Sequence, residues 1–489
     1  MPPSRKGPAA ASVLSVTPEC APLVKTGGLG DVSAALPAAL RAIGVDARVL
    51  LPGYPSVLAA DPAARELAQF ITLGAKVRLL ESRLPSGVPL LVLDCPPLYV
   101  RGGGPYQKEN GDDWEDNALR FGVLSRVAAM LGTAQSPIDW RPDVIQCHDW
   151  PTALAPVYLR FSPAPRAATL TTIHNIAFQG SFAFAEIDAL ELPAASRGTD
   201  GVEFYGRASF LKGALMYSDA INTVSPTYAR EIQTPELGFG LDGVLRMRSR
   251  DLYGVLNGID TALWNPATDP WIPERYDANS LEKKAASKRA LKKRFALGGA
   301  DDIPLAASVG RLAHQKGIDV LVEAIARLAA LPLQLVVIGA GDRGLAGQLN
   351  AMHARHPGTV GVLIGFDEGL AHLAEAGADM FLMPSRFEPC GMNQMYSQRY
   401  GTPPVAHATG GLVDTVKDFN PGEAGSATGF LIHEVTANAL VAGVRRAVAA
   451  YRDHDQWRKL QRNGMAQDFG WESAAKAYAA IYARITPTS

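Results

Sequence analysis

The sequence predicts an α/β protein with two doubly wound domains, each built on a parallel sheet that helices cover on both faces. Three observations indicate this. Short, continuous apolar runs alternate with longer stretches of helix-like apolar spacing in both halves of the chain. Polar motifs directly follow the apolar runs. A glycine pair in similar surroundings occurs near each end, at Gly27-Gly28 and Gly410-Gly411. The length of 489 residues also exceeds what one core usually organises.

Composition excludes several classes of protein. Lysine plus arginine (47) nearly balances aspartate plus glutamate (48), so the basic footprint of a nucleic-acid binder is missing. The four cysteines form no CxxC pair, which argues against a zinc site or a disulfide framework. No apolar run reaches the ~18 residues of a membrane span, and residues 1–12 lack the apolar core of a signal peptide. We therefore expect a cytoplasmic protein with no nucleic-acid or membrane partner.

The first domain is predicted to span residues 1–262. Helix-like spacing covers residues 31–43 and 114–131 between the strands. In open parallel sheets, ligands bind outside the carboxyl ends of the strands, which is where polar residues cluster here. The predicted strands of this domain are residues 13–16, 47–51, 90–93, 144–146, 169–173 and 221–224.

The second domain is predicted to span residues 263–465, and residues 263–273, rich in Trp, Pro, Asp and Asn, are expected to connect the two domains. The basic stretch 281–295 indicates a solvated helix face, with contact to an anionic partner as the alternative. Residues 466–489 are predicted to hold a final amphipathic helix that must dock elsewhere. The predicted strands are residues 305–309, 334–338, 360–364, 380–383, 404–406 and 429–432.

The two glycine pairs are candidate phosphate loops. Each follows a predicted strand and precedes a predicted helix, so backbone N–H groups at a helix N-terminus face any ligand there. The first pair also carries Lys25, a point charge suited to phosphate. A tight strand-to-helix turn without a ligand is the alternative interpretation of either pair alone.

In the second domain, Arg311 and Lys316 follow a strand and are suited to neutralising a diphosphate leaving group. Two solvated cations at a helix start are the alternative. Residues 384–391 form a polar loop bracketed by prolines, in which Glu388 is placed to hold sugar hydroxyls. The N–H groups after Glu388, near Cys390 and Gly391, are placed to hold phosphate at a helix start.

In the first domain, His148-Asp149 and His174-Asn175 end neighbouring predicted strands. A His–Asp pair suggests a hydrolase, but no G-x-S-x-G nucleophile elbow accompanies it. Metal binding by His148, Asp149 and His174 is conceivable, although their spacing matches no zinc pattern. The pair alone therefore does not decide the chemistry.

Together these motifs resemble those of the bacterial glycogen synthases, retaining glycosyltransferases whose family includes the plant starch synthases. The resemblance covers nearly the whole chain, from about residue 13 to residue 485. The matching stretches are APLVKTGGLGD at 21–31, QCHDW at 146–150, TIHNIAFQG at 172–180, TVSPTYARE at 223–231, GVLNGID at 254–260, SRFEPCG at 385–391 and the second glycine loop at 409–416.

The resemblance implies two Rossmann-like domains that face each other across a cleft, the GT-B type, with the last helix crossing back to the first domain. It implies transfer of glucose from ADP-glucose to the non-reducing end of an α-1,4-glucan such as glycogen. Configuration would be retained, with neither metal nor cofactor. The alternatives are UDP-glucose as donor, a phosphorylase-like enzyme that uses pyridoxal phosphate, and a non-catalytic glucan-binding scaffold. The sequence does not specify the oligomeric state.

The resemblance also implies roles for individual residues. Glu388 would contact the donor glucose, Arg311 and Lys316 the departing diphosphate, while His174 would lie beside the anomeric carbon and Asp149 on the acceptor side. Related families carry a second glutamate eight positions after the first, where Tyr396 stands here, and often an arginine where His407-Ala408 stand. The residues expected to bind the donor are Lys25, Gly27, Gly28, Asn175, Phe366 (stacked on adenine), Cys390, Gly391, Gly410 and Gly411.

Overall fold

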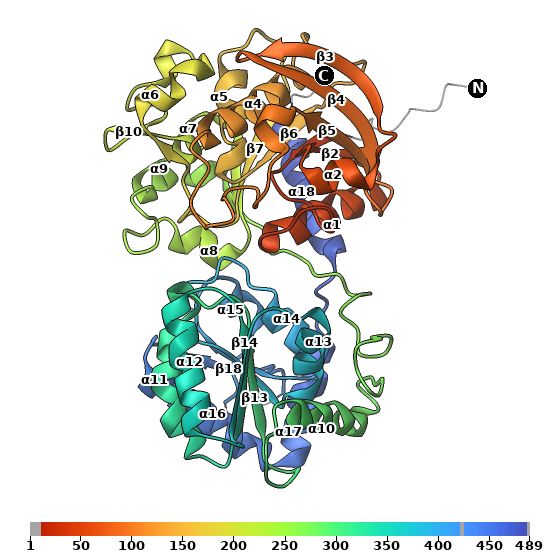
Figure 1. The fold of residues 1–489 in the computed structure, drawn as a ribbon, viewed down its shortest axis with the longest axis vertical. Coiled ribbons are helices and arrows are strands. Elements are labelled where there is room, and N and C mark those ends of the chain that lie inside the picture. The colour runs from red at the N-terminus through yellow and green to blue at the C-terminus, as the bar shows by residue number, and fades with distance from the viewer. Residues whose placement is uncertain (1–10, 421–424, 487–489) are drawn as a thin grey trace, which may run out of the picture. The chain divides into compact units, whose positions relative to one another are not determined.

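A computed structural model describes residues 11–420 and 425–486 and divides the chain into two units. The first unit comprises Met1–Gly258 and Trp471–Ser489, and the second comprises Ile259–Gly470. The domain boundaries expected from the sequence, 262/263 and 465/466, differ from these by a few residues. Each unit has its own parallel sheet and its own apolar core (Figure 1).

Within the described residues, the first unit is organised on a nine-stranded sheet in the order β12-β11-β7-β6-β1-β2-β5-β4-β3. The strands from β12 to β5 run parallel, whereas β4 and β3 are antiparallel additions at one edge. All six strands predicted for this half are present, and β3, β4 and β12 are unpredicted. The strands are β1 Ser12–Val16, β2 Asp46–Pro52, β3 Arg65–Thr72, β4 Ala75–Arg83, β5 Pro89–Asp94, β6 Val144–His148, β7 Ala168–Ile173, β11 Ala220–Thr223 and β12 Leu252–Gly254.

A small antiparallel sheet in the order β8-β10-β9 stands apart from the large one. Its strands are β8 Ser181–Phe182, β9 Glu203–Phe204 and β10 Arg207–Ser209. The helices of the first unit are α1 Gly28–Ala42, α2 Pro55–Ala60, α3 Pro96–Tyr99, α4 Asn117–Leu131, α5 Leu154–Arg160, α6 Phe184–Ile187, α7 Phe210–Tyr217, α8 Pro226–Glu231, α9 Asp242–Met247 and α18 Trp471–Ile485.

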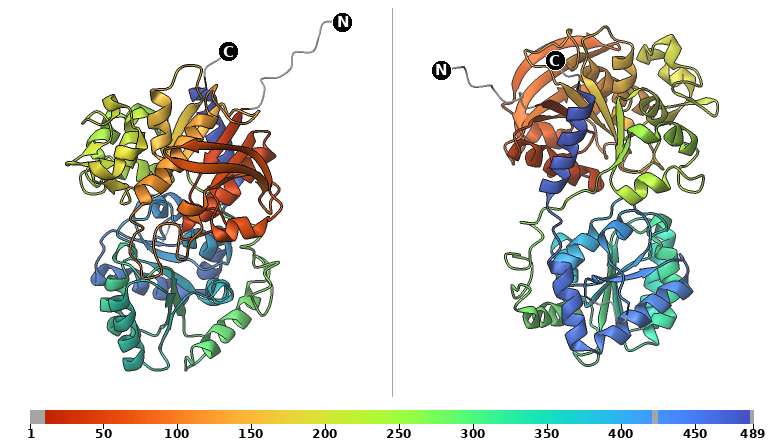
Figure 2. Two further views of the ribbon diagram at one scale, coloured as in Figure 1. Left: turned by 45° about the horizontal axis from the view of Figure 1, so that its top comes forward. Right: turned by 180° about the vertical axis from the view of Figure 1, so that it is seen from behind.

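The last helix, α18, packs beside α1 on the large sheet of the first unit (Figure 2). Tyr478 and Tyr482 on its buried face are fully enclosed. The Tyr482 hydroxyl donates to Gln146 Oε1 on β6 at 2.6 Å, and Asn222 Nδ2 on β11 donates to the Tyr478 hydroxyl at 2.9 Å. Buried tyrosines with satisfied hydroxyls therefore anchor this helix to the sheet.

The second unit contains a parallel sheet in the order β15-β14-β13-β16-β17-β18. Helices α11, α12 and α16 contribute to the core on one face, and α10 and α13 to the core on the other (Figure 1). The strands are β13 Leu305–Val309, β14 Gln334–Gly339, β15 Val360–Ile364, β16 Met380–Met383, β17 Pro404–His407 and β18 Phe430–Ile432; the helices are α10 Lys284–Arg294, α11 Ile318–Ala329, α12 Arg343–Arg355, α13 Glu368–Gly377, α14 Asn393–Arg399, α15 Gly410–Thr415, α16 Ala437–Tyr451 and α17 His454–Met465.

The basic stretch 281–295 is solvated on one face only: Lys283, Arg289, Lys293 and Arg294 are exposed, as the composition indicates. Lys284, Lys288 and Lys292, which lie four residues apart, are buried along one face. Lys284 Nζ donates to two backbone carbonyls and to Thr402, and Lys288 pairs with Asp379 at 2.7 Å. The ammonium groups of these lysines therefore find their partners within the second unit.

The predicted inter-domain connection, residues 263–273, is packed onto the second unit. The Trp264 ring lies between those of His372 and Tyr396, with both ring centroids 3.9 Å away and nearly parallel planes. Asp269 accepts hydrogen bonds from Tyr400 and His372. Among the described residues, no helix is long and apolar enough to cross a membrane.

Candidate active site

The predicted site residues of the second unit lie on loops that follow the carboxyl ends of adjacent strands. Arg311 and Lys316 follow β13, the loop 384–391 follows β16, and the second glycine pair follows β17. Because β13, β16 and β17 are neighbours in the sheet, these loops meet at one edge.

Glu388 is held as a buried carboxylate at this edge. Its side chain is 6% exposed, and Lys316 Nζ donates to both of its oxygens, at 2.8 and 2.6 Å. The Ser385 hydroxyl donates to Glu388 Oε2 at 3.0 Å. A paired and hydrogen-bonded carboxylate is fixed in orientation, which suits a group that must meet a sugar hydroxyl at a set place.

The second glycine pair is packed against the Glu388 loop. A Cβ on Gly410 would stand 1.9 Å from the Glu388 carbonyl oxygen, and one on Gly411 would stand 1.9 Å from that of Cys390. The Gly411 N–H donates to the Glu388 carbonyl at 3.0 Å. This N–H therefore has an intramolecular acceptor in place of the phosphate expected from the sequence, and the glycines serve close backbone packing.

The turn at Cys390 and Gly391 is also fixed by the protein itself. Cys390 is buried, and Gly391 adopts a left-handed backbone with φ +68°. Gln394 Nε2 on α14 donates to the carbonyls of both residues at 3.0 Å. The loop that carries Glu388 is therefore braced by the helix that follows it.

Arg311 and Phe366 are more open. Arg311 is exposed just beyond β13, and Phe366, beyond β15, is 73% exposed. An exposed ring is available to stack on a planar base, as expected of Phe366. His407 stands where relatives often carry arginine; its Nδ1 lies 2.7 Å from the Ser385 carbonyl, and burial lowers its pKa, so it is uncharged at neutral pH.

In the first unit, the first glycine loop encloses a carboxylate of the protein itself. Glu19 is buried, and its Oε2 accepts the N–H groups of Thr26 at 2.5 Å and Gly27 at 3.1 Å. Its Oε1 accepts the Tyr106 hydroxyl at 2.6 Å, and burial beside Glu19 keeps the pKa of Tyr106 well above its ordinary value. The N–H groups of Gly27 and Gly30 are thus occupied, the second by the Gly27 carbonyl at 3.2 Å, while Gly28 opens the first turn of α1, where N–H groups lack the usual acceptor four residues earlier.

Lys25 lies beside this loop, partly exposed. Its Nζ is 2.8 Å from Asp31 Oδ1, with the two side chains 49% and 30% exposed. An ion pair this open to water is weak and is readily exchanged for a stronger anion. Lys25 is therefore accessible, and its phosphate contact, which would replace the contact with Asp31, stays a prediction.

Buried His148 and half-buried His174 form a pair at the ends of β6 and β7. His148 Nδ1 lies 2.9 Å from His174 Nε2, and His148 Nε2 lies 3.0 Å from the Ser15 hydroxyl. Burial lowers the pKa of His174 to about 3 and that of His148 well below its ordinary value. Both rings are therefore neutral at physiological pH, and each fixes the orientation of the other.

Asp149 supports the same corner from a strained backbone. Its φ of +55° is left-handed, which is unusual for a residue other than glycine. Its Oδ1 accepts the N–H groups of His174 at 2.7 Å and Asn175 at 3.4 Å. Burial raises the pKa of Asp149 to about 7, and these two N–H groups act in the opposite direction. Asp149 thus positions the His174-Asn175 turn.

The hydrolase and metal interpretations of this corner gain no support. His148 contacts Ser15 and His174, and Asp149 holds backbone, so no nucleophile–base–acid chain is formed. Within the described residues, no group of three or more His, Cys, Asp or Glu side chains is arranged to hold a metal ion.

Three residues that hold the candidate site in shape were not predicted from the sequence. They are Glu19, Tyr106 and Ser385. Glu19 precedes the first glycine loop by a few residues. Nothing in the sequence distinguishes a carboxylate at that position from an ordinary loop residue. Tyr106 comes from a separate loop 87 positions away in the chain. Ser385 lies inside the predicted loop 384–391. A hydroxyl three residues before Glu388 was the signal in the sequence that could have indicated their hydrogen bond.

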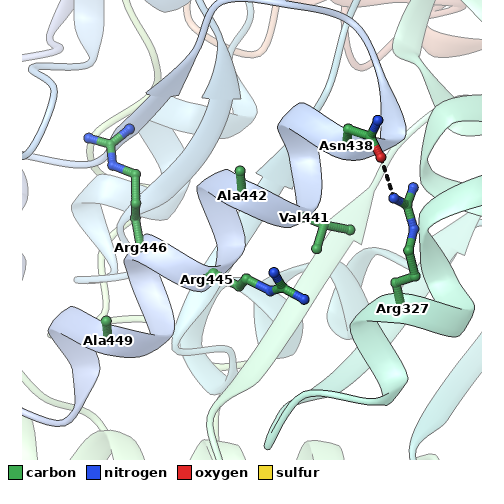
Figure 3. A pocket seen from close by; sticks show the side chains of 7 residues that line it. All are labelled: Arg327, Asn438, Val441, Ala442, Arg445, Arg446 and Ala449. Carbon is green, nitrogen blue, oxygen red and sulfur yellow. Dashed lines mark hydrogen bonds between the residues drawn. The ribbon is translucent and has the colours of Figure 1, made fainter.

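A concave surface lies away from these loops, on α11 and α16 (Figure 3). Arg327 and Arg445 reach into it, and Arg327 donates to Asn438. The predicted site residues do not line this groove. It lies on helix surfaces and not on the loops at the carboxyl ends of the strands, where the candidate chemistry is gathered.

Comparison with known proteins identifies this architecture. Residues 12–247 match the family model described as "Starch synthase catalytic domain", and residues 290–464 match "Glycosyl transferases group 1". The catalytic domain of starch synthase IV from Arabidopsis thaliana, bound to ADP and acarbose, aligns with a TM-score of 0.87 and 32% identity over 98% of this chain and 99% of its own. The fold is that of a GT-B glycosyltransferase.

Curated relatives narrow the class further. Glycogen synthase from Nitrosomonas eutropha is 53% identical over 478 residues, 96% of this chain and 95% of its own. Glycogen synthase from Aromatoleum aromaticum is 54% identical over 96% of each chain. The protein belongs to the bacterial glycogen synthase family. A sucrose-phosphate synthase from Thermosynechococcus elongatus, at 17% identity and a TM-score of 0.59, shares the fold alone.

Proposed function

We propose that this protein transfers glucose from ADP-glucose to the non-reducing end of an α-1,4-glucan with retention of configuration. The observation that carries the proposal is the Glu388 carboxylate, held by Lys316 and Ser385 on the loop after β16. The similarity to a starch synthase bound to ADP and acarbose supports both the nucleotide and the glucan.

In the proposed reaction, negative charge develops on the diphosphate as the bond to the anomeric carbon breaks. Arg311, Lys316 and Lys25 are the cations assigned to that charge. Lys316 also contacts Glu388, so the same ammonium orients the group that binds the donor glucose. No protein nucleophile is assigned: the acceptor hydroxyl attacks on the face that the diphosphate leaves, and the diphosphate takes its proton.

His174 is assigned to the reacting centre through its backbone carbonyl. Its ring contacts His148 and its N–H contacts Asp149, so its position is fixed from two sides. A neutral ring with a pKa of about 3 does not serve as a base near pH 7. Its role is therefore positional and electrostatic. We assign the reaction to the cytoplasm, with neither metal nor cofactor.

The test is a radiolabel transfer assay on glycogen with ADP-glucose against UDP-glucose, each with and without a chelator. The proposal predicts faster transfer from ADP-glucose and no effect of the chelator. Preference for UDP-glucose would overturn the nucleotide assignment, and loss of activity with chelator would overturn the metal-free assignment. Transfer from glucose 1-phosphate, with the absorbance of bound pyridoxal phosphate, would identify a phosphorylase. Glucan binding with no transfer from any donor would identify a scaffold.

A further inference from the structure

Three polar side chains form a continuous hydrogen-bonded chain across neighbouring strands of the first unit. Ser15 lies on β1, His148 ends β6, and His174 follows β7. His148 Nε2 lies 3.0 Å from the Ser15 hydroxyl, and His148 Nδ1 lies 2.9 Å from His174 Nε2. Because β7, β6 and β1 are adjacent in the sheet, the chain runs from the interior of the unit to the corner assigned to the reacting centre.

The two rings allow two arrangements of protons along this chain. Burial lowers the pKa of both rings, so each is neutral, with one N–H donor and one acceptor nitrogen. In the first arrangement, Ser15 donates to His148 Nε2 and His148 Nδ1–H donates to His174 Nε2, so the proton of His174 is on Nδ1. In the second arrangement, His174 Nε2–H donates to His148 Nδ1, and His148 Nε2–H donates to the Ser15 hydroxyl.

The surroundings of Ser15 select the first arrangement. Ser15 is 2% exposed, and His148 is the one hydrogen-bond partner of its hydroxyl among the described residues. In the second arrangement the hydroxyl accepts from His148, so its own proton has no acceptor. A buried donor without a partner is costly, and that arrangement should be less populated by about tenfold or more. Ser15 therefore donates, and both rings carry their proton on Nδ1.

The arrangement of protons matters at the other end of the chain. His174 is half-buried, and within the described part of the protein its Nδ1 has no hydrogen-bond partner and is not sealed from solvent. Asp149 accepts the backbone N–H of His174 at 2.7 Å and so fixes the backbone below the ring. Ser15 thus decides, two hydrogen bonds away, whether the free nitrogen of His174 is a donor or an acceptor.

A second buried hydroxyl at the same corner differs from Ser15 in this respect. Thr223 on β11 is fully buried and donates to the Ile173 carbonyl at 2.7 Å, one residue before His174. This bond ends on the backbone and involves no ring. Its loss would therefore loosen the same corner and leave the proton arrangement of the histidines unchanged.

We propose that Ser15 and His148 are positioning residues that hold His174 in its Nδ1–H form, so that the ring presents an N–H donor to the reacting sugar. This inference rests on the proposed function, because it assigns the free nitrogen to that enzyme's reacting centre. Ser15 and His148 act through His174 and contact no substrate themselves. The Nε2–H form of His174 would turn a lone pair towards the sugar and lose this donor.

The test determines the tautomer of His174 in the full-length protein. After ¹⁵N labelling of histidine, two-bond ¹H–¹⁵N spectra distinguish Nδ1–H from Nε2–H rings, and His174→Asn assigns the signal of His174. The parent should show the Nδ1–H form in about tenfold excess or more. Ser15→Ala removes the selecting donor and should bring the two forms to about equal amounts. Ser15→Cys keeps a weak S–H donor and should restore the excess.

Initial rates of glucose transfer to glycogen give a second readout. For Ser15→Ala, kcat/KM for ADP-glucose should fall by about twofold, in proportion to the lost Nδ1–H form. The inhibition constant of ADP, which lacks the sugar, should not change. Thr223→Val is the matched control: it removes one buried hydrogen bond and should lower the unfolding temperature, but it should leave the tautomer of His174 and the rates unchanged.

An Nε2–H form of His174 in the parent would overturn the proposal. An unchanged Nδ1–H excess in folded Ser15→Ala would also overturn it, as would an equal loss of kcat/KM in Thr223→Val with no change of tautomer. The expected tautomers in a protein that transfers glucose from no donor would refute the proposed function and keep the assigned proton arrangement.

Discussion

The two glycine loops resemble each other in sequence but differ in what surrounds them. The first, at Gly27-Gly28, has open space above it: a Cβ on Gly27 would meet nothing within 4 Å. The second, at Gly410-Gly411, is filled by the protein's own backbone, because the carbonyls of Glu388 and Cys390 press against it. The first loop therefore leaves room at Gly27, whereas the glycines of the second allow the Glu388 loop to approach closely.

The carboxylates near the two loops also differ. In the first unit, buried Glu19 accepts N–H groups of the loop itself and fixes its shape, while Lys25 pairs with half-buried Asp31. In the second unit, the buried carboxylate is Glu388, and it pairs with the cation Lys316. Glu19 thus shapes the first glycine loop, whereas Glu388 is the carboxylate that the proposed function assigns to the donor glucose.

The largest expected effect belongs to Glu388. Glu388→Ala should lower kcat by about a hundredfold or more, because the donor glucose loses the group that orients it. Ser385→Ala is the matched control: it removes one hydrogen bond at 3.0 Å and leaves the carboxylate and Lys316 in place, so a much smaller loss is expected. Steady-state kinetics with near-normal kcat for Glu388→Ala would remove Glu388 from the reacting centre.

Glu19→Gln should affect the first loop more than the chemistry. The glutamine oxygen still accepts the Tyr106 hydroxyl, but its amide nitrogen cannot accept the N–H groups of Thr26 and Gly27. We expect a loss of about 1–3 kcal/mol in the free energy of unfolding and a higher donor KM. Urea unfolding measures the first and initial rates the second. Parent-like values of both would show that Glu19 does not shape the loop.

Asp149 should make stability depend on pH. Its folded pKa of about 7 is above its ordinary 3.8, so between these values the folded protein keeps a proton that the unfolded chain has released. The free energy of unfolding should therefore fall as pH rises through this window, and Asp149→Asn should remove that fall. Asn retains the oxygen that accepts the His174 N–H and tolerates the left-handed backbone.

The measurement is urea unfolding at pH 4.5 and pH 7.5 for the parent and Asp149→Asn, with exposed Asp455→Asn as control. Between these two pH values, the free energy of unfolding of the parent should fall by on the order of a few kcal/mol more than that of Asp149→Asn. Identical pH dependence of the two proteins would mean that Asp149 is ionised in the folded state throughout.

Lys25→Ala should have the smallest effect on stability. Its partly exposed pair with Asp31 contributes little to folding, so the unfolding temperature should stay close to that of the parent. Donor KM should rise about tenfold or more, because a charge-assisted contact to phosphate is lost. Asp31→Asn, which frees Lys25 from its partner, should not raise donor KM. Unchanged kinetics of Lys25→Ala towards ADP-glucose would place Lys25 outside the donor site.

Much of the fold was predictable because buried parallel strands leave continuous apolar runs that survive in sequence. The six predicted strands of each half are all present. The β3–β4 hairpin was missed because edge strands such as Arg65–Thr72, exposed along much of their length, lack such a run. The buried face of α10 was missed because lysines can bury their stems and satisfy the ammonium on partners such as Asp379, which lies far away in the chain.

The site was predictable where one short motif carries the residues, as at 25–31, 311–316 and 384–391. The sequence did not indicate which backbone N–H groups already donate hydrogen bonds within the protein. The N–H groups of Gly27 and Gly411 have acceptors at Glu19 and Glu388, and these partners are set by tertiary packing. Similar motifs therefore gave equal expectations for two loops whose surroundings differ.

Gly27→Ala and Gly411→Ala, compared by thermal unfolding and donor KM, test this difference most directly. Gly27 has an extended backbone with φ −151° and room for a methyl group, so Gly27→Ala should fold like the parent but bind donor more weakly. Gly411→Ala should lower the free energy of unfolding by about 2 kcal/mol or more, because its Cβ would stand 1.9 Å from the Cys390 carbonyl oxygen. Equal destabilisation by both, or parent-like donor KM for Gly27→Ala, would contradict the assignment of an open, ligand-binding loop to the first unit alone.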